Sequence, residues 1–356
     1  MQTDLASLHI LFVTVASQAI GFGHLSRCLA LAAHAQKRHA DIGFLVFGGD
    51  AAEDRIKGAG FACIRLDESA LNAGHWPQTA HLRADAVMAD MIFPGFDRVC
   101  RDVEGLFGRL RGLGRLLTAI DVLGEASLAR RFPEVPVDLL VSPYVATPVE
   151  TSGRRWRFIE GARYALLSPD YAGLPARTQR NSASRVLVSC GGSDPKGYTA
   201  EVLRGLERLT RRIEVRVVIG PLFGAALRQQ IQVLVDESRH AVTPVKVASS
   251  LRHDMLWCDM AIGANGLTKY ELAATATPSL LFSIDAHHEE VNRPFAAKKT
   301  AAHLGIGISA ETVSREAERL LSDVVLRSEM AARGSALVDG VGAQRLFDEI
   351  KKELLC

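Results

Sequence analysis

The sequence lacks the features that mark several classes of protein. No apolar run reaches the roughly 20 residues needed to span a bilayer, and the start, Met1-Gln2-Thr3-Asp4, lacks the positive charge that begins a signal peptide. We therefore expect a cytoplasmic protein with no stable membrane insertion. The six cysteines are scattered and include no C-x-x-C pair, which indicates reduced thiols and neither a disulfide framework nor a metal site.

An excess of charge of either sign is also missing. The chain has 42 basic and 40 acidic residues, for a formal net charge of +2, which argues against nucleic acid as a partner. Its 356 residues, 48% hydrophobic and 23% charged, are typical of a soluble globular protein and exceed what one core usually fills. We expect two domains and a monomer or weak dimer.

Apolar strand-like runs alternate with amphipathic helical stretches, which predicts an α/β fold with parallel sheets. A polar stretch with Gly and Pro predicts a linker over 173–184, between domains over 1–172 and 185–342. The apolar stripe of 343–356 predicts a C-terminal helix that packs back on the first domain. Predicted strands cover 8–15, 42–47, 62–66, 86–89, 115–120 and 139–141, then 186–189, 215–219, 260–262 and 279–282.

The first candidate site is the turn Gly21-Phe22-Gly23-His24, which joins the first predicted strand to a helix. His24 would lie over the carboxyl end of a buried strand, where open parallel sheets bind ligands. Gly21 and Gly23 would let a substrate approach the backbone. The alternative is a purely structural turn, a tight connection in which the imidazole only caps the helix.

Asp90 and Asp121 each end a predicted strand of the same domain. Both are candidate substrate ligands at the edge of the sheet that holds His24. A strand-terminal Asp is more often a turn former or a helix cap, so this alternative remains open for each.

Two glycine turns are candidate nucleotide sites in the second domain. Gly191, Gly192 and Ser193 follow a strand, and their backbone N–H groups suit a phosphate; alternatively, Ser193 or Asp194 merely caps the next helix. The turn matches neither a Walker loop nor a Rossmann fingerprint.

The second turn comprises Asn265, Gly266, Leu267 and Thr268, and its N–H groups would bind a diphosphate. Glu271, one helical turn later, has two oxygens for the hydroxyls of a ribose. The alternative is a capping box between Thr268 and Glu271.

A polar loop over 283–294 follows the next strand and suits sugar recognition, with Asn292 as a predicted substrate ligand. Its His and acidic residues match no metal-binding template, so we expect no metal there.

Taken in order, these motifs resemble the UDP-sugar hydrolases of pseudaminic acid biosynthesis and the related spore-coat polysaccharide proteins. The resemblance implies a GT-B fold, related to family 28-like glycosyltransferases, with two Rossmann-like domains and an interdomain cleft. It also implies that the second domain holds UDP and that His24 lies at the sugar. By analogy, Glu271 holds the ribose. The matching stretches are 20–29, Asp90, 120–121, 164–169, 190–196 and 264–271, whereas 265–270 and 285–293 depart from the expected pattern.

The first functional hypothesis is hydrolysis of a UDP-linked amino-deoxy sugar at the anomeric carbon, without a cofactor. The free sugar would serve nonulosonic (pseudaminic-type) acid or surface polysaccharide biosynthesis. His24 would take the proton of water, since a helix N-terminus favours neutral imidazole. Lys196 or Lys269 would stabilise the leaving UDP. Arg27 would hold a sugar or phosphate oxygen, or else lie solvated at the surface.

Two other classes of function remain open. An inverting GT-B glycosyltransferase would use the same site with a sugar or lipid-linked acceptor in place of water, and a non-catalytic nucleotide-sugar binding protein would use it without turnover. The only candidates for membrane docking are Phe93-Pro94-Gly95-Phe96 and a predicted arginine-rich helix over 98–115, which a solvated helix face explains equally.

Overall fold

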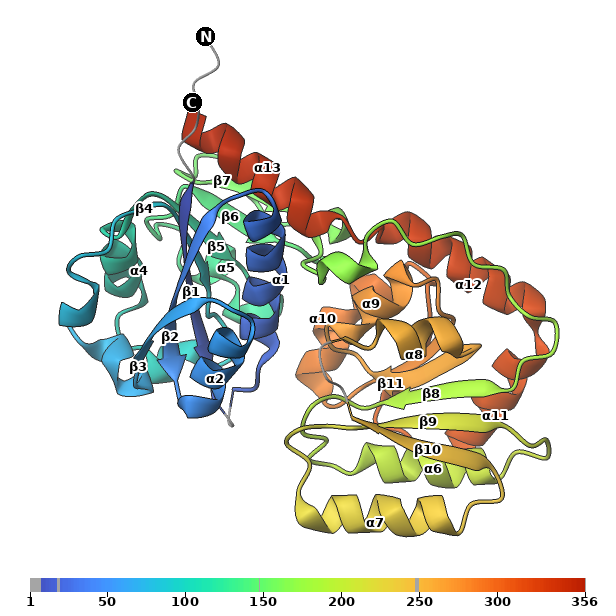
Figure 1. The fold of residues 1–356 in the computed structure, drawn as a ribbon. Coiled ribbons are helices and arrows are strands. Elements are labelled where there is room, and N and C mark those ends of the chain that lie inside the picture. The colour runs from blue at the N-terminus through green and yellow to red at the C-terminus, as the bar shows by residue number, and fades with distance from the viewer. Residues whose placement is uncertain (1–7, 18–19, 147, 247–249, 356) are drawn as a thin grey trace. The chain divides into compact units, whose positions relative to one another are not determined.

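A computed structural model describes residues 8–17, 20–146, 148–246 and 250–355 (Figure 1). The chain divides into two compact units. Unit 1 comprises Met1–Pro169 and Gly340–Cys356, and unit 2 comprises Asp170–Asp339. In the described ranges, no helix is long and apolar enough to cross a bilayer.

Unit 1 is built on a seven-stranded sheet with the order β3-β2-β1-β4-β5-β6-β7, and every neighbouring pair is parallel. Its strands carry apolar residues on both faces because helices cover both sides. The strands are β1 (His9–Ala16), β2 (Asp41–Gly48), β3 (Ala62–Leu66), β4 (Ala84–Asp90), β5 (Gly114–Ile120), β6 (Leu139–Ser142) and β7 (Arg157–Glu160).

The helices of unit 1 fall on the two faces of this sheet. Apolar residues of α1 (Gly23–Lys37), α2 (Asp50–Gly58) and α13 (Gly342–Leu355) pack on one face, and those of α4 (Val103–Arg111) and α5 (Leu128–Arg131) on the other. Helix α13 therefore belongs to the core of unit 1 although it ends the chain. The remaining elements are α3 (Phe96–Val99) and short 3-10 turns at Glu68–Asn72, Pro77–Thr79, Gly124–Ala126 and Ala162–Tyr164.

Unit 2 has a six-stranded parallel sheet with the order β10-β9-β8-β11-β12-β13. One face packs on α6 (Tyr198–Glu207), α7 (Ala225–Asp236) and α11 (Ala310–Ser322). Figure 1 shows α8 (Arg252–Trp257), α9 (Thr268–Ala274) and α10 (Ala286–Ala296) on the other side, with α12 (Val324–Leu337) beyond α9. The strands are β8 (Arg185–Ser189), β9 (Glu214–Ile219), β10 (Ala241–Lys246), β11 (Met260–Ala264), β12 (Ser279–Ser283) and β13 (Ala302–Ile306), and a 3-10 turn covers Pro169–Tyr171.

The strand order of each sheet reverses once, and ligands of open α/β sheets bind at such a point. In unit 1 the reversal lies between β1 and β4, which pair with each other. In unit 2 it lies between β8 and β11. These four strands are the ones that lead into His24, Asp90 and the two glycine turns of unit 2.

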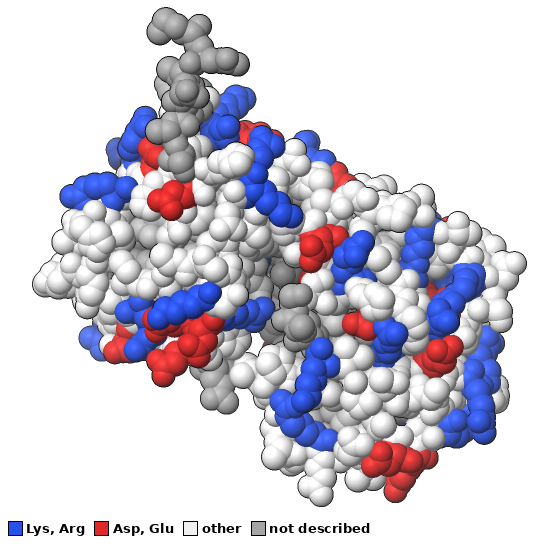
Figure 2. All heavy atoms as spheres, in the orientation of Figure 1, with Lys and Arg blue, Asp and Glu red and all other residues white. Residues whose placement is uncertain are grey.

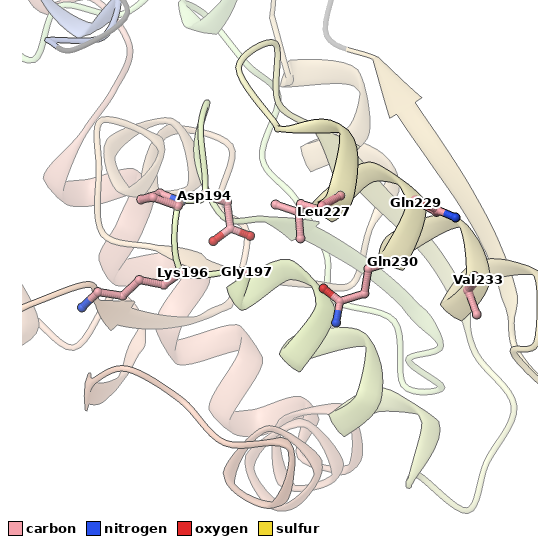
Figure 3. Close-up of a pocket in the computed structure, with 9 residues that line it drawn as sticks. Asp194, Lys196, Gly197, Leu227, Gln229, Gln230 and Val233 are labelled. Carbon is pink, nitrogen blue, oxygen red and sulfur yellow. The ribbon is translucent and has the colours of Figure 1, made fainter.

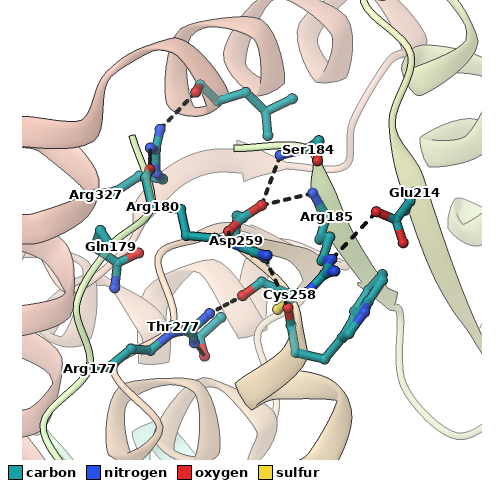
Figure 4. A network of polar contacts seen from close by, with 12 residues as sticks. Arg177, Gln179, Arg180, Ser184, Arg185, Glu214, Cys258, Asp259, Thr277 and Arg327 are labelled. Atoms are coloured by element: carbon teal, nitrogen blue, oxygen red, sulfur yellow. Dashed lines mark hydrogen bonds and ion pairs between the residues drawn. The ribbon is translucent and has the colours of Figure 1, made fainter. Parts of the chain in front are cut away.

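The segment predicted as a linker is anchored to unit 2 (Figure 4). Asp259 is buried and accepts hydrogen bonds from the backbone N–H groups of Ser184 and Arg185. It also accepts from Arg180 Nε at 2.7 Å. Arg177 donates to the carbonyls of Met255 and Cys258. The chain over 177–185 is therefore part of the folded unit, because buried charges and carbonyls fix it.

The arginine-rich segment is not one helix, as 98–115 was expected to be. Helix α3 ends at Val99, α4 begins at Val103, and Arg115 lies in β5. The side chain of Asp102 caps α4 by accepting from Gly105 N. Arg109 lies over the Trp76 ring, with its guanidinium carbon 5.3 Å from the centroid.

On the face that Figure 2 draws, basic and acidic side chains are interspersed.

Candidate functional site

His24, Asp90 and Arg27 form a buried cluster at the carboxyl ends of β1 and β4. His24 Nδ1 lies 2.7 Å from Asp90 Oδ1. Arg27 donates from Nε to Asp90 Oδ2 at 2.6 Å and from Nη2 to Oδ1 at 2.7 Å. The strand register aligns Thr14 with Asp90, and His24 lies in the first turn of α1, so β1–β4 pairing brings the cluster together.

The cluster determines which nitrogen of His24 carries the proton. Arg27 Nη2 and Asp90 Oδ1 both lie 2.7 Å from Nδ1. Arg27 Nη2 can only donate but already donates to Asp90 Oδ1, whereas a bare Nδ1 would point its lone pair at that carboxylate oxygen, which can only accept. We therefore assign the proton to Nδ1, which donates to Asp90 and leaves Nε2 as the proton acceptor.

The electrostatics of the cluster favour neutral imidazole. Burial lowers the pKa of His24 below its ordinary value and Arg27 adds to this effect, whereas Asp90 opposes it. Burial acts to raise the pKa of Asp90, yet Arg27 and His24 hold that pKa below its usual range. Near neutral pH the site thus contains a charged Asp90–Arg27 pair and an uncharged imidazole.

Asp90 and Arg27 are both more buried than a substrate ligand or a solvated surface residue would be. Asp90 is 1% exposed and its two oxygens are occupied by His24 and Arg27. The Arg27 side chain is 12% exposed, so it is not a solvated surface residue. Both side chains therefore make their hydrogen bonds within the His24 cluster.

The turn before α1 has the conformation that its glycines allow. Gly21 has a φ of +84°, and its N–H donates to Ser17 O at 2.8 Å. A Cβ on Gly23 would lie 3.9 Å from Arg27 Nη1. His24 does not cap α1, because its ring contacts Asp90 and no side chain caps that helix.

Asp121 has a structural role instead of the predicted contact with substrate. It is 3% exposed. Oδ1 accepts from the backbone of Val122 and Leu128, and Oδ2 from Ser127 Oγ and Ala129 N, at 2.6–3.2 Å. The four bonds fix the turn into α5, which is the cap alternative that the sequence left open.

Sequence reasoning missed two aromatic neighbours of this cluster. The Phe93 ring centroid lies 6.2 Å from that of His24, and the Arg27 guanidinium carbon lies 5.9 Å from the centroid of Tyr144. Tyr144 follows β6 by two residues. Its place after a predicted strand of the same sheet was the available signal, because the carboxyl ends of parallel strands share one edge.

In unit 2, the turn over Gly191, Gly192 and Ser193 is open. All three residues are exposed, Gly191 has a φ of +95°, and no atom lies within 4 Å of a Cβ built on either glycine. Asp194 caps α6, because its oxygens accept from Tyr198 N at 2.9 Å and Thr199 N at 2.7 Å. The cap alternative thus holds for Asp194, while the backbone of the preceding turn stays accessible.

The second turn contains a polar atom without a partner. Asn265 is 7% exposed, and its Nδ2 lies 3.1 Å from His303 Nδ1. His303 Nε2 lies 2.7 Å from Glu289 Oε2. Asn265 Oδ1 is buried and has no hydrogen bond in the described structure. His303 was not predicted, because the strand that carries it, β13, was not predicted.

Glu271 lies just beyond this turn and is half-buried. Burial raises its pKa to about 7, and the hydroxyls of Tyr171 and Thr268 oppose that rise. The side chain of Thr268 does not cap α9, so the two residues do not form a capping box. The Tyr171 hydroxyl is buried without a well-formed hydrogen bond, and the carboxylate helps to raise its pKa. Nothing in the sequence signalled Tyr171.

Asn292 and Lys269 form a buried pair. Lys269 Nζ donates to Asn292 Oδ1, and Asn292 Nδ2 lies 3.3 Å from Ser283 Oγ. The ammonium also lies 5.2 Å from the ring centroids of Tyr270 and Phe295. Burial lowers the pKa of Lys269 to about 7. Asn292 is 1% exposed, so its amide serves this pair and is not open to a ligand.

The polar loop before α10 is arranged around the helix start. Asp285 caps α10 by accepting from His288 N at 2.8 Å, and His288 Nδ1 lies 2.7 Å from the same oxygen. In the part of the chain that the structure describes, no three His, Cys, Asp or Glu side chains are grouped in a way that could hold a metal ion.

A shallow pocket of about 660 Å³ lies on the outer side of the Asp194–Gly197 loop, against α7 (Figure 3). Leu227, Gln229, Gln230 and Val233 line it from the helix. Asp194 and Lys196, both considered in the sequence analysis, line it from the loop.

No family model matches the chain. The chain is 28% identical over 193 residues to the spore coat polysaccharide biosynthesis protein SpsG of Bacillus subtilis (strain 168), which covers 53% of this chain and 57% of that protein. The chain spans 57% and 60% of the lengths of the two curated relatives that it matches, less than two thirds of each.

Two solved structures resemble the whole chain. The calicheamicin glycosyltransferase CalG4 has a TM-score of 0.63 at 17% identity, covering 98% of this chain and 99% of that one. S. aureus MnaA in its UDP co-structure has a TM-score of 0.65 at 12% identity, covering 98% and 97%. Together with the two parallel sheets, this likeness confirms the predicted GT-B fold.

Proposed function

We propose that this chain is an inverting glycosyltransferase that uses a UDP-sugar as donor, with His24 as the general base. The observation that carries the proposal is the buried His24 imidazole at the switch point of the first sheet, which burial keeps neutral and which Asp90 orients through Nδ1. A base of this kind is what an acceptor hydroxyl needs before it attacks an anomeric carbon.

The reaction balances with the groups present. The acceptor oxygen attacks the anomeric carbon from the face opposite the nucleotide, its proton passes to His24 Nε2, and the bond between that carbon and the diphosphate oxygen breaks. The electron pair of that bond leaves with UDP. Asp90 stabilises the imidazolium that forms, and Arg27 keeps Asp90 ionised and oriented.

The nucleotide is assigned to unit 2 in this proposal. Glu271 would accept hydrogen bonds from the ribose hydroxyls, and the open turn over 191–193 would hold the diphosphate through its backbone N–H groups. UDP is chosen because a solved structure with the same fold, MnaA, carries UDP.

Hydrolysis of a UDP-linked amino-deoxy sugar is the second candidate. It is favoured by the order of motifs that resembles the UDP-sugar hydrolases, and it needs only water in place of the acceptor hydroxyl. The similarity to SpsG supports a role in polysaccharide biosynthesis for either reaction. The name of CalG4, a glycosyltransferase, favours transfer.

The test is UDP release from UDP-N-acetylglucosamine and UDP-glucose, measured with and without a panel of sugar and lipid-linked acceptors. Release that requires an acceptor supports transfer, whereas equal release without one replaces transfer by hydrolysis. His24→Ala should abolish release while UDP affinity is kept, and His81→Ala, which removes an exposed histidine of the same unit, should change nothing. UDP binding without any turnover would instead indicate a binding protein.

A further inference from the structure

Lys196 connects two loops that flank the second glycine turn. It belongs to the loop between β8 and α6, and its Nζ donates to Ile284 O at 2.6 Å, just after β12. Strand β11 lies between β8 and β12 in the sheet. The side chain therefore bridges the carboxyl ends of the strands on either side of Asn265 and Gly266. Lys196 also lines the shallow pocket, and Figure 3 shows its ammonium pointing away from Leu227 and Gln229.

The charge of Lys196 is not compensated by an acidic group. Its ammonium has three donors, and the Ile284 carbonyl is the one partner that the described structure gives it. Within the described ranges, no carboxylate lies within 4.0 Å of this ammonium. A neutral carbonyl at an exposed position is a weak competitor for a cation, so an anionic ligand could displace it.

The other lysine considered for this site is excluded by its surroundings. Lys269 is 6% exposed, bonds to the buried Asn292, and lies between the rings of Tyr270 and Phe295. Moving its ammonium to a ligand would leave Asn292 Oδ1 unpaired. Lys196 can move without such a loss.

Two further features at the same edge of the sheet suit a ligand. The exposed N–H groups of Gly192 and Ser193 precede it by a few residues, and Asn265 Oδ1, in a residue that is 7% exposed, lacks a hydrogen bond in the described structure. The first can bind phosphate oxygens, and the second can accept from a hydroxyl or N–H group of the same molecule.

We propose that Lys196 is the diphosphate-binding cation of this protein, and that it exchanges the Ile284 carbonyl for a β-phosphate oxygen when the ligand binds. This inference rests on the proposed function. In the reaction, the ammonium would neutralise the charge that grows on the departing diphosphate as the bond to the anomeric carbon breaks.

Isothermal titration calorimetry with UDP, UMP, uridine and inorganic pyrophosphate tests the assignment. Lys196→Ala and Lys196→Gln should weaken UDP binding about 10- to 100-fold, the loss expected for a charge-assisted hydrogen bond, and leave uridine binding unchanged. Lys298→Ala, which removes an exposed lysine of the same unit, is the matched control and should bind all four as the parent does.

The outcomes separate this assignment from the proposed function. UDP affinity that is unchanged in both Lys196 variants, or an equal loss for uridine, overturns the role of Lys196 while the function stands. If the parent protein binds pyrophosphate through Lys196 but does not bind UDP, the anion-binding role of Lys196 stands and the assignment of UDP is wrong. A parent that binds neither overturns both.

Discussion

His24 Nδ1 and Asp90 Oδ1 lie 2.7 Å apart although 66 residues separate them in the chain. The contact fixes the tautomer of His24, and with Arg27 it forms a cluster in which each member depends on the other two.

The pH profile of the reaction should show an acid limb below about pH 6.5, because the pKa of His24 lies below its ordinary value and only neutral imidazole accepts a proton. Asp90→Asn removes the carboxylate that raises this pKa, so the limb should move to lower pH while kcat falls. His24→Ala should lower kcat/KM by about 10² to 10⁴. A profile that keeps its acid limb in His24→Ala would assign the limb to another group.

Asp90→Ala should destabilise unit 1 by about 3–5 kcal/mol, because it leaves the buried Arg27 guanidinium without its partner. The double variant Arg27→Met, Asp90→Ala should recover part of this loss, since neither charge is then buried alone. Urea unfolding followed by circular dichroism gives both values. If the free-energy losses of Asp90→Ala and of Arg27→Met alone simply add in the double variant, the pair does not act as a unit.

UDP affinity should rise with pH through about 7, because the pKa of Glu271 is raised to about 7 and the ionised carboxylate is the better acceptor for ribose hydroxyls. Glu271→Gln should bind UDP more weakly and show no such rise. Calorimetry at about pH 6 and about pH 8, roughly one unit either side of that pKa, measures both. Glu237→Gln, at an exposed position of the same unit, serves as control and should keep the rise.

Unit 2 should become more stable as the pH rises from about 7 toward 10.5. The pKa of Lys269 is lowered from 10.5 to about 7 on folding, so in this window the unfolded chain binds a proton that the folded chain does not. Lys269 should contribute a slope of up to about 1.4 kcal/mol per pH unit. Lys269→Met should remove that contribution and Lys298→Met should not. An unchanged slope in Lys269→Met would contradict the assignment.

Gly342→Ala should loosen α13 from unit 1. A Cβ at this position would lie 2.3 Å from Ala165 O and 2.6 Å from Ala165 N, and the backbone cannot move aside cheaply. Hydrogen exchange in α13 should therefore accelerate, and the thermal midpoint should fall. Gly58→Ala is the control, because no atom lies within 4 Å of a Cβ there.

The sequence by itself determined the strands that lead into the site and the turns that follow them. Periodic apolar runs predicted β1, β4, β8 and β11 to within two residues at either end, because strands buried on both faces read as continuous hydrophobic segments. The edge strands β7, β10 and β13 were not predicted, since none of their residues, apart from Ile159, is buried. Gly21 and Gly191 were found as turns because their positive φ values suit glycine.

Only the tertiary structure decided what the polar residues at these turns do. Asp90 and Asp121 look alike in sequence, each ending a strand, yet Asp90 faces His24 and Arg27 while Asp121 accepts four bonds from its own following turn. The partners of Glu271 and Asn265, Tyr171 and His303, come from distant segments. A local pattern specifies which face a residue occupies, whereas hydrogen bonds between distant segments depend on strand order, which folding sets.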